Sequence, residues 1–165
     1  MRVLFKTLFF LFVIQSTFSY ACQCKSLRSV TEEIDRSDAV LVGRIISKES
    51  FQIEADPNKL RNIDNYSRDK TFSGIKYQLK VFKSYKGKIK EDIVTIYSSN
   101  YSGNCGYIFE VDEIYIVYGY KYNYYMTNED IYTFPENHPI FWTNRCMRTR
   151  KSDNDEIAEI NKALN

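Results

Sequence analysis

The hydrophobic positions of this chain begin with one uninterrupted apolar run and continue as short, alternating segments. The run from Leu8 to Ile14 is too short to span a bilayer and follows a positively charged start. This arrangement predicts a signal peptide over residues 1–21, because Ser19 and Ala21 are the small residues that signal peptidase accepts before its cut. We therefore expect a mature chain that begins at Cys22.

After the signal peptide, apolar and polar residues alternate with the two-residue period of β-strands. Between Ile75 and Val81 the apolar side chains fall on one face, which is typical of a half-buried strand. Gly43 lies inside an apolar run and is expected to mark a bulge, and the polar stretch from residue 49 to 73 is predicted to be a long exposed loop. Runs rich in β-branched and aromatic residues predict further strands at 39–46, 92–97, 113–120, 130–134 and 141–146.

Two further segments have helical signals. Ser29 and Glu32 have capping-box spacing at the start of a short N-terminal helix. Apolar residues at helical spacing predict an amphipathic C-terminal helix from about residue 153, capped by Ser152 or Asp153. With five to six strands, these helices predict a mainly β fold, a small barrel with helical additions, and a sandwich is the alternative. Residues 22–165 are expected to form a single domain.

The charges of the chain are balanced once the signal peptide is removed. The full sequence has 23 Lys and Arg against 21 Asp and Glu, and residues 1–21 contain only Arg2 and Lys6, so the mature chain has 21 of each sign. Non-specific nucleic-acid binding needs an excess of positive charge, so we expect no nucleic-acid partner. We also expect no transmembrane segment and a secreted, extracellular protein, with a periplasmic or lipid-anchored location as the alternatives.

Export would place four cysteines in an oxidising compartment, where two disulfides are the expected outcome. We do not expect Cys22 and Cys24 to pair with each other, and each is expected to find a distant partner, Cys105 or Cys146. These residues alone leave both pairings open. A zinc site made from the same four thiols is disfavoured, because C-x-C lacks the usual two-residue gap of a zinc knuckle.

Catalytic and cofactor-binding motifs are absent from the sequence. There is no H-E-x-x-H, no G-x-S-x-G and no glycine-rich phosphate loop, and the one histidine, His138, lies between prolines in a loop-like segment. We therefore expect a protein that is not an enzyme and holds no cofactor. Six lysines between residues 76 and 90 and a crowd of tyrosines between 115 and 125 are the candidate surfaces of a simple binding module, for a glycan or a protein partner.

A known family shares the arrangement of short motifs in the mature chain. These motifs are Cys22-Gln23-Cys24, Ser37-Asp38-Ala39-Val40 at the start of a strand, Cys105-Gly106-Tyr107, and Phe141 to Cys146. Their order resembles the N-terminal domain of the tissue inhibitors of metalloproteinases, an OB-fold barrel that netrin modules share. The resemblance extends to about Thr149 and implies a single-domain version, bacterial or otherwise, stapled by disulfides. It also implies the pairs Cys22–Cys105 and Cys24–Cys146.

The resemblance further implies a function. In that family the free α-amine and the carbonyl oxygen of the first cysteine chelate the catalytic zinc of a target metalloprotease and displace its water. Carried over, the protease-binding residues are Cys22, Gln23, Cys24 and Lys25, and Cys22 contacts the zinc of the target through its backbone. An α-amine with a pKa of about 8 can lose its proton near neutrality, as such a ligand must.

Several features depart from the family pattern or offer another explanation. Gln23 stands where animal inhibitors have Ser or Thr, and Lys25 replaces a small or apolar residue. The third disulfide of the inhibitory domain and the separate C-terminal domain are absent.

In the alternative interpretation the C-x-C only staples the chain end of a secreted, disulfide-stabilised binding module. A lipid on Cys22 would acylate the amine and prevent chelation. Asn65 and Asn100 fit the pattern of N-glycosylation acceptors.

Overall fold

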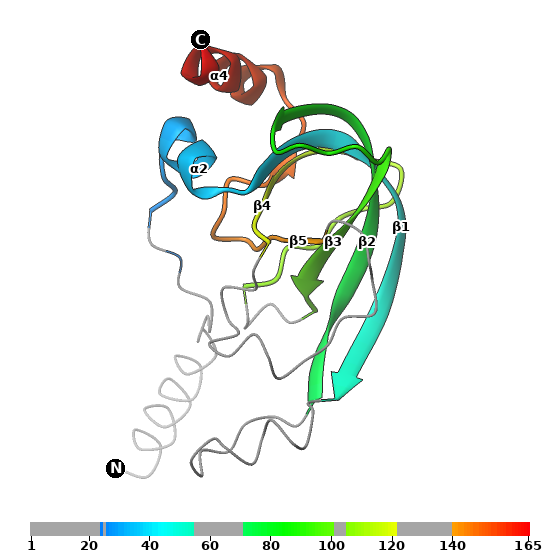
Figure 1. The fold of residues 1–165 in the computed structure, drawn as a ribbon. Coiled ribbons are helices and arrows are strands. Elements are labelled where there is room, and N and C mark those ends of the chain that lie inside the picture. Colours follow the sequence, from blue (N-terminus) through cyan, green and yellow to red (C-terminus); the bar gives the residue numbers. More distant parts are fainter. Residues whose placement is uncertain (1–23, 25, 55–70, 101–104, 122–139) are drawn as a thin grey trace, which may run out of the picture.

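The computed structural model describes residue 24 and residues 26–54, 71–100, 105–121 and 140–165, and every structural statement below concerns these residues. Their order is α2 (Val30–Arg36), β1 (Ala39–Glu54), β2 (Thr71–Lys86), β3 (Ile93–Ser99), β4 (Ile114–Gly119), β5 (Ile140–Trp142), β6 (Arg150–Lys151) and α4 (Asn154–Leu164) (Figure 1). The fold is mainly β, as the alternating pattern predicts, with one helix before and one after the strands.

The strands form one six-stranded mixed sheet with the order β5-β3-β2-β1-β4-β6. All neighbouring strands are antiparallel except β3 and β5, which are parallel. The sheet is open, because β4 and β5 share no ladder. A single antiparallel bridge joins Tyr120, just beyond β4, to Trp142 in β5, with N–H to O distances of 2.9 and 2.7 Å. The described strands thus belong to one sheet rather than the two of a sandwich.

Both faces of the central strands are buried, which explains why β4 is apolar at every position. One face carries a core that includes Leu41, Tyr115 and Val117. The opposite face carries a second core in which Val40 and Tyr118 pack beneath the two helices. Figure 1 shows α2 and α4 lying together on this side. Successive residues of a strand point to opposite faces, so an unbroken apolar run supplies both cores.

The first strand has an irregular register where a bulge was predicted at Gly43, but the extra residue lies on the neighbouring strand. Val42 is opposite Lys83 and Gly43 is opposite Val81, so Phe82 of β2 has no partner in this ladder. A Cβ atom at position 43 would lie 2.4 Å from the backbone oxygen of Lys80 on β2, so only glycine permits this close approach.

The predicted loop from residue 49 to 73 is wrong at both of its ends. β1 continues to Glu54 and β2 already begins at Thr71, so the two strands pair far beyond the core. This part of the ladder has few buried positions, and polar side chains occupy it without cost, so the sequence lacks the alternation that marks a half-buried strand. The centre of the predicted loop lies outside the described residues.

Other predicted elements have different outcomes. The short N-terminal helix is confirmed together with its capping box, in which Ser29 and Glu32 bond reciprocally. The C-terminal helix is confirmed with Asp153 as its N-cap. The strand predicted at 141–146 ends at Trp142, because the next residues turn towards the disulfide described below. The strand predicted at 130–134 lies outside the described residues.

Candidate functional site: the disulfide node at the N-terminal segment

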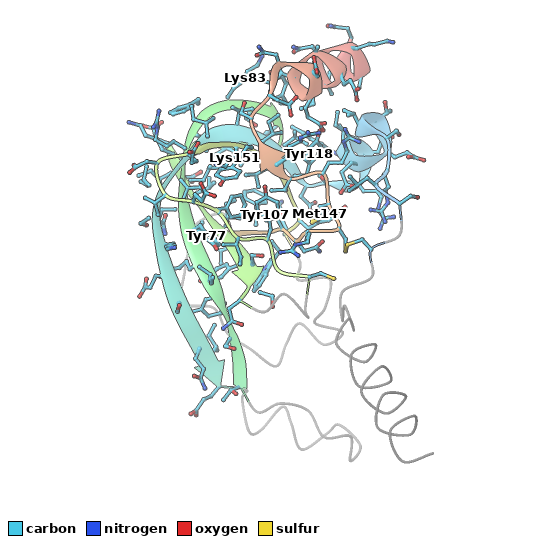
Figure 2. All side chains as sticks on the ribbon, turned by 180° about the vertical axis from the view of Figure 1, so that it is seen from behind. Tyr77, Lys83, Tyr107, Tyr118, Met147 and Lys151 are labelled. Atoms are coloured by element: carbon cyan, nitrogen blue, oxygen red, sulfur yellow. A yellow bond between two sulfur atoms is a disulfide. The ribbon has the colours of Figure 1, made fainter. Side chains whose placement is uncertain are left out.

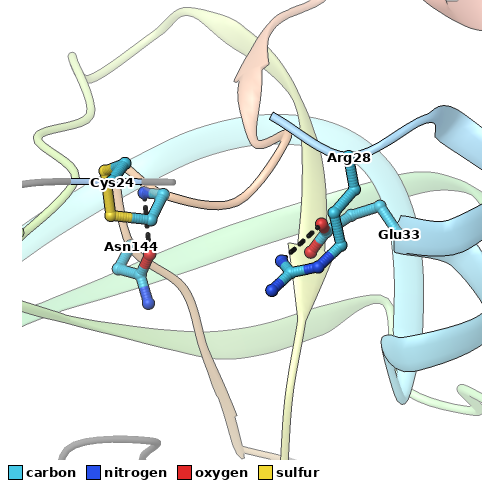
Figure 3. Close-up of a disulfide and its surroundings, with 5 residues drawn as sticks. Cys24, Arg28, Glu33 and Asn144 are labelled. Atoms are coloured by element: carbon cyan, nitrogen blue, oxygen red, sulfur yellow. Dashed lines mark hydrogen bonds and ion pairs between the residues drawn. A yellow bond between two sulfur atoms is a disulfide. The ribbon is translucent and has the colours of Figure 1, made fainter. Parts of the chain in front are cut away.

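A disulfide joins the N-terminal segment to the end of the sheet. Cys24 and Cys146 are bonded across 122 residues of sequence, and their Cα atoms lie 5.1 Å apart. Cys24 is exposed and Cys146 is half-buried. Figure 3 shows this disulfide beside Asn144. The pair that the family resemblance implies for Cys24 is therefore confirmed.

Cys105 completes a compact group of sulfur atoms. The Sγ atoms of Cys24, Cys105 and Cys146 all lie within 4.8 Å of one another, although they come from three separate segments. Cys105 is buried, and it is also disulfide-bonded. Its predicted partner Cys22 lies outside the described residues, as do Gln23 and Lys25. We call the group formed by Cys24, Cys105, Gly106, Asn144 and Cys146 the disulfide node.

Backbone contacts hold the two inner segments of the disulfide node against each other. Gly106 forms an antiparallel bridge with Asn144, and the N–H of Arg145 donates to the carbonyl oxygen of Cys105 at 2.7 Å. The side-chain oxygen of Asn144 accepts the N–H of Cys146 at 2.8 Å. These bonds fix the turn that directs Cys146 towards Cys24.

Cys105 and Gly106 occupy positions that few residues tolerate. Cys105 has a φ of 56°, in the left-handed region. A Cβ atom on Gly106 would lie only 1.9 Å from the backbone oxygen of Ser99 on β3, so glycine is required there. Residues Cys105 and Gly106 can therefore lie close against β3 only because Gly106 has no side chain.

Stacked aromatic rings support the sheet beneath the disulfide node. Trp142 stacks on Tyr97 with ring centroids 4.9 Å apart, and Phe51 meets the edge of Tyr97 at 4.7 Å. The N–H of Thr143 donates to the carbonyl oxygen of Tyr97 at 3.1 Å. Because Thr143 immediately precedes Asn144, this packing links the node to β3 and β5.

A second tether holds the N-terminal segment four residues after Cys24. The carbonyl oxygen of Arg28 accepts a hydrogen bond from Nη1 of Arg148 at 2.8 Å. The guanidinium of Arg28 itself pairs with the fully buried carboxylate of Glu33 at 3.2 Å, as Figure 3 shows. Glu33 also accepts the hydroxyl of Tyr120 at 3.0 Å. The segment from Cys24 to α2 is therefore fixed at both ends.

The tether from Arg148 depends on a buried carboxylate. Oε1 of Glu156 in α4 accepts Nε of Arg148 at 2.8 Å and the hydroxyl of Tyr118 at 2.6 Å. Burial acts to raise the pKa of Glu156, but hydrogen bonds from Arg148 and Tyr118 outweigh it and lower this pKa below 4.5. Burial is the main cause that raises the pKa of Tyr118, and the hydrogen bond to Glu156 is the second. The phenol therefore keeps its proton and remains a hydrogen-bond donor. Figure 2 shows Tyr118 beneath the C-terminal helix.

The thiols and carboxylates of the described residues offer one candidate metal site, and it is the disulfide node itself. Zinc binds thiolates, whereas Cys24 and Cys146 share a disulfide and Cys105 is in one. The arrangement therefore acts as a cross-link rather than a metal centre.

Three of the six lysines that suggested a basic surface have individual structural contacts. Lys76 pairs with Glu49 at 3.1 Å, and the ammonium of Lys83 lies over the ring of Tyr85. Lys86 donates to the carbonyl oxygens of Ile34 and Asp35 at 2.7 and 3.0 Å, which places its charge at the C-terminal end of α2. These contacts favour the interpretation of the lysines as part of an ordinary strand surface.

The tyrosines named as a candidate binding surface are largely internal where the structure describes them. Tyr115 and Tyr118 are fully buried in the two opposite cores, and Tyr120 is half-buried against Glu33. None of these three rings is exposed, and exposure of other rings in the crowd stays a prediction. The tyrosines at 122, 124 and 125 lie outside the described residues.

Sequence reasoning missed the polar network that holds the N-terminal segment. Asp153 and Glu156 have the spacing of a capping pair, and Asp153 does accept the N–H of Glu156 at 2.7 Å. The side chain of Glu156 turns instead to Arg148, eight positions earlier, and no local pattern marks that contact. The one available signal was a glutamate on the apolar face of the predicted helix, beside Ile157 and Ile160.

Neither a family model nor a curated protein matches this chain. Within the described part of the chain, no helix has both the length and the apolar character needed to cross a membrane.

Proposed function

We propose that the protein inhibits zinc metalloproteases through its mature N-terminus. Signal-peptide cleavage after Ala21 would expose the α-amine of Cys22, and the ridge from Cys22 to Lys25 would enter the cleft of the target. The observation that supports this most is the bond between Cys24 and Cys146, beside the sulfur of Cys105. It anchors the chain two residues after the proposed terminus.

Anchoring supports the proposal because zinc chelation by a chain end needs a fixed direction. A flexible terminus loses conformational freedom on binding, which weakens the complex. Here Cys24 is held by its disulfide, and Arg28 is held by Arg148. Cys24 nevertheless remains exposed, as a position beside a binding ridge must be.

The chemistry of chelation requires two backbone atoms of Cys22 and an open position on the zinc of the target. A neutral α-amine is a suitable nitrogen ligand, and the adjacent carbonyl oxygen closes a five-membered ring with it. Binding in this way removes the zinc-bound water that a metalloprotease uses for hydrolysis. Gln23 would then approach the pocket next to the zinc and influence which targets are accepted.

The proposal includes an OB-fold for the strands that carry the node. The strand order, the parallel pairing of β3 with β5, and the bridge between Tyr120 and Trp142 all support it. In the proposed barrel, the β4–β5 side would be the side of closure, and the bridge between Tyr120 and Trp142 is its one contact among the described residues. A partly open barrel of this kind would place the Cys105 segment and β5 side by side.

The experiment that tests this function compares two forms of the protein against a panel of secreted metalloproteases. One form begins at Cys22, and the other carries one extra alanine before it. The extra residue converts the chelating amine into an amide and leaves the described contacts of the node unchanged, so potency should fall by about 100-fold or more, as expected for losing a metal ligand. Peptide mapping without reduction verifies that both forms keep the Cys24–Cys146 bond.

The outcomes separate the proposal from its alternative. Equal inhibition by the two forms would mean that chelation by Cys22 is wrong. No inhibition of any protease by either form, together with binding to a glycan or a protein, would favour the binding module. Mass spectrometry that finds a lipid on Cys22 would also exclude the mechanism, because the amine would be acylated.

A further inference from the structure

The outer half of β1 has an open edge. Along one side, β1 pairs with β2 all the way to Glu54. Along the other side, β4 pairs only with Ala39 to Arg44. The N–H of Ile45 also donates to the carbonyl oxygen of Glu113, and the carbonyl oxygen of Ile45 accepts the N–H of Asp112. Among the described residues, no strand pairs with this side of β1 from Ser47 to Glu54. Figures 1 and 2 agree that β1 runs along the outside of the β1–β2 ribbon.

This edge is long and carries little of the usual protection against strand pairing. Natural edge strands are usually short or interrupted by proline, bulges and charged side chains. Here eight residues, Ser47 to Glu54, contain no proline, and the bulge lies at their beginning, between Ile45 and Ser47. The carboxylate of Glu49 forms an ion pair with the ammonium of Lys76 on β2, with Nζ and Oε2 3.1 Å apart. Lys48 and Glu54 are the exposed charges that remain on the edge.

The register of the sheet shows which backbone groups face outwards. Ile45 directs both its N–H and its C=O to the side of β4. Ile45 is opposite Leu79 of β2, and Ser47 is opposite Gln78, so the bulge makes Ser47 face β2. Alternate residues then face the open side: Lys48, Ser50, Gln52 and Glu54.

These four residues are complementary to themselves in an antiparallel arrangement. A second copy that runs in the opposite direction, centred on Phe51, places Lys48 opposite Glu54 of the second copy. The two-fold symmetry repeats this opposite-charge pair at the other end. Ser50 faces Gln52 of the second copy, and the two Phe51 residues meet at the centre. Because all four outward residues pair, this register makes the largest number of bonds.

We propose that the protein forms a symmetric homodimer by antiparallel pairing of the two β1 edges from Lys48 to Glu54. The dimer extends each sheet across the two-fold axis and leaves the disulfide node outside the contact. The contact is one strand wide, so its area is that of a weak or transient interface. The dimer is therefore expected at micromolar or higher concentrations rather than at nanomolar ones.

Sedimentation velocity of the mature protein, from about 1 μM to about 1 mM, covers the range in which such small interfaces associate. Lys48→Glu places two glutamates opposite each other at both ends of the contact, and dimerisation should weaken by about tenfold. Lys48→Glu combined with Glu54→Lys restores opposite charges, and the dissociation constant should return to within about threefold of the original. Lys88→Glu makes the same charge change at an exposed residue away from the edge and should have no effect.

A backbone variant tests the pairing independently of charge. Ser50→Pro removes an N–H that faces the open side and leaves the bonds to β2 in place, so dimerisation should be lost while the fold is kept. A circular dichroism spectrum like that of the original protein verifies the fold. A protein that stays monomeric over the whole range would overturn the proposal. A dimer that is insensitive to both Lys48→Glu and Ser50→Pro would overturn it as well.

Discussion

Glu156 is the residue through which the C-terminal helix and the N-terminal segment influence each other. Its side chain is 1% exposed, and Arg148, with 16%, is its main cationic partner. Arg148 in turn holds the carbonyl oxygen of Arg28. Removing the charge of Glu156 leaves a largely buried guanidinium without its carboxylate, which is more costly than losing an exposed pair.

We predict that Glu156→Gln lowers the free energy of unfolding by about 2–3 kcal/mol, because the charge of Arg148 stays in a mostly buried place. Glu159→Gln is the matched control. Glu159 lies on the same helix at 3.8 Å from Arg148, but its side chain is 62% exposed, so the change should cost less than about 0.5 kcal/mol. Urea denaturation of the three proteins measures both values. Equal losses in the two variants would contradict the role given to burial.

The same comparison has a predicted pH dependence. The pKa of Glu156 is lowered in the folded protein, so its stabilisation is fully present above its ordinary value of 4.5. It is lost as the pH falls through the lowered pKa, because the folded state then takes up the proton. The stability difference between the original protein and Glu156→Gln should therefore be constant from about pH 7 to about pH 5 and shrink below that. A difference that grows on acidification would contradict this assignment.

Among the elements, β1 connects the core, the bulge and the open edge. Its first half was predictable from the sequence, because Val40 and Leu41 lie in opposite cores and Gly43 lies at an irregularity of the register. Its second half was not, since a paired ribbon beyond the core needs no buried face. The turn at Asn144 was also hidden, because its bonds to Gly106 and Cys146 depend on tertiary contacts rather than on local pattern.

We predict that Gly43→Ala destabilises the protein by about 2–3 kcal/mol, because the new Cβ atom would force β1 away from β2. The clash is with the backbone oxygen of Lys80, which cannot move without the strand. Ser47→Ala, at an exposed position of the same strand, is the control and should change stability by less than about 0.5 kcal/mol. Thermal unfolding followed by circular dichroism distinguishes them. Similar transition temperatures for the two variants would show that the bulge accommodates a side chain.

For the molecule as a whole, the Cys24–Cys146 disulfide covalently joins two segments that are 122 residues apart in sequence. The C-x-C pattern and a secreted location predicted a cross-link from the chain end to a distant cysteine. Only the family resemblance indicated Cys146, since the C-x-C pattern alone leaves both pairings open. The burial of Cys105 and the support from Tyr97 and Trp142 needed the structure, because these contacts join segments distant in sequence.

We predict that replacing both Cys24 and Cys146 by serine lowers the free energy of unfolding by about 2–5 kcal/mol, because the unfolded chain gains the freedom of a long loop. Inhibitory potency should fall as well, since the chain end loses its anchor. Denaturation and inhibition assays on the same sample measure both effects. Full inhibitory potency in a variant with this lower stability would contradict the role of the disulfide in the proposed function.

The central claim, that the mature N-terminus of this protein coordinates the zinc of a target enzyme, is tested most directly on a cobalt-substituted metalloprotease. The visible spectrum of cobalt reports its ligands, so replacement of water by an amine and a carbonyl oxygen is observed at the metal itself. We predict that the form beginning at Cys22 changes the cobalt spectrum in proportion to inhibition, whereas the form with an added alanine leaves it unchanged. An unchanged spectrum in a protease that is fully inhibited by the Cys22 form would contradict the account.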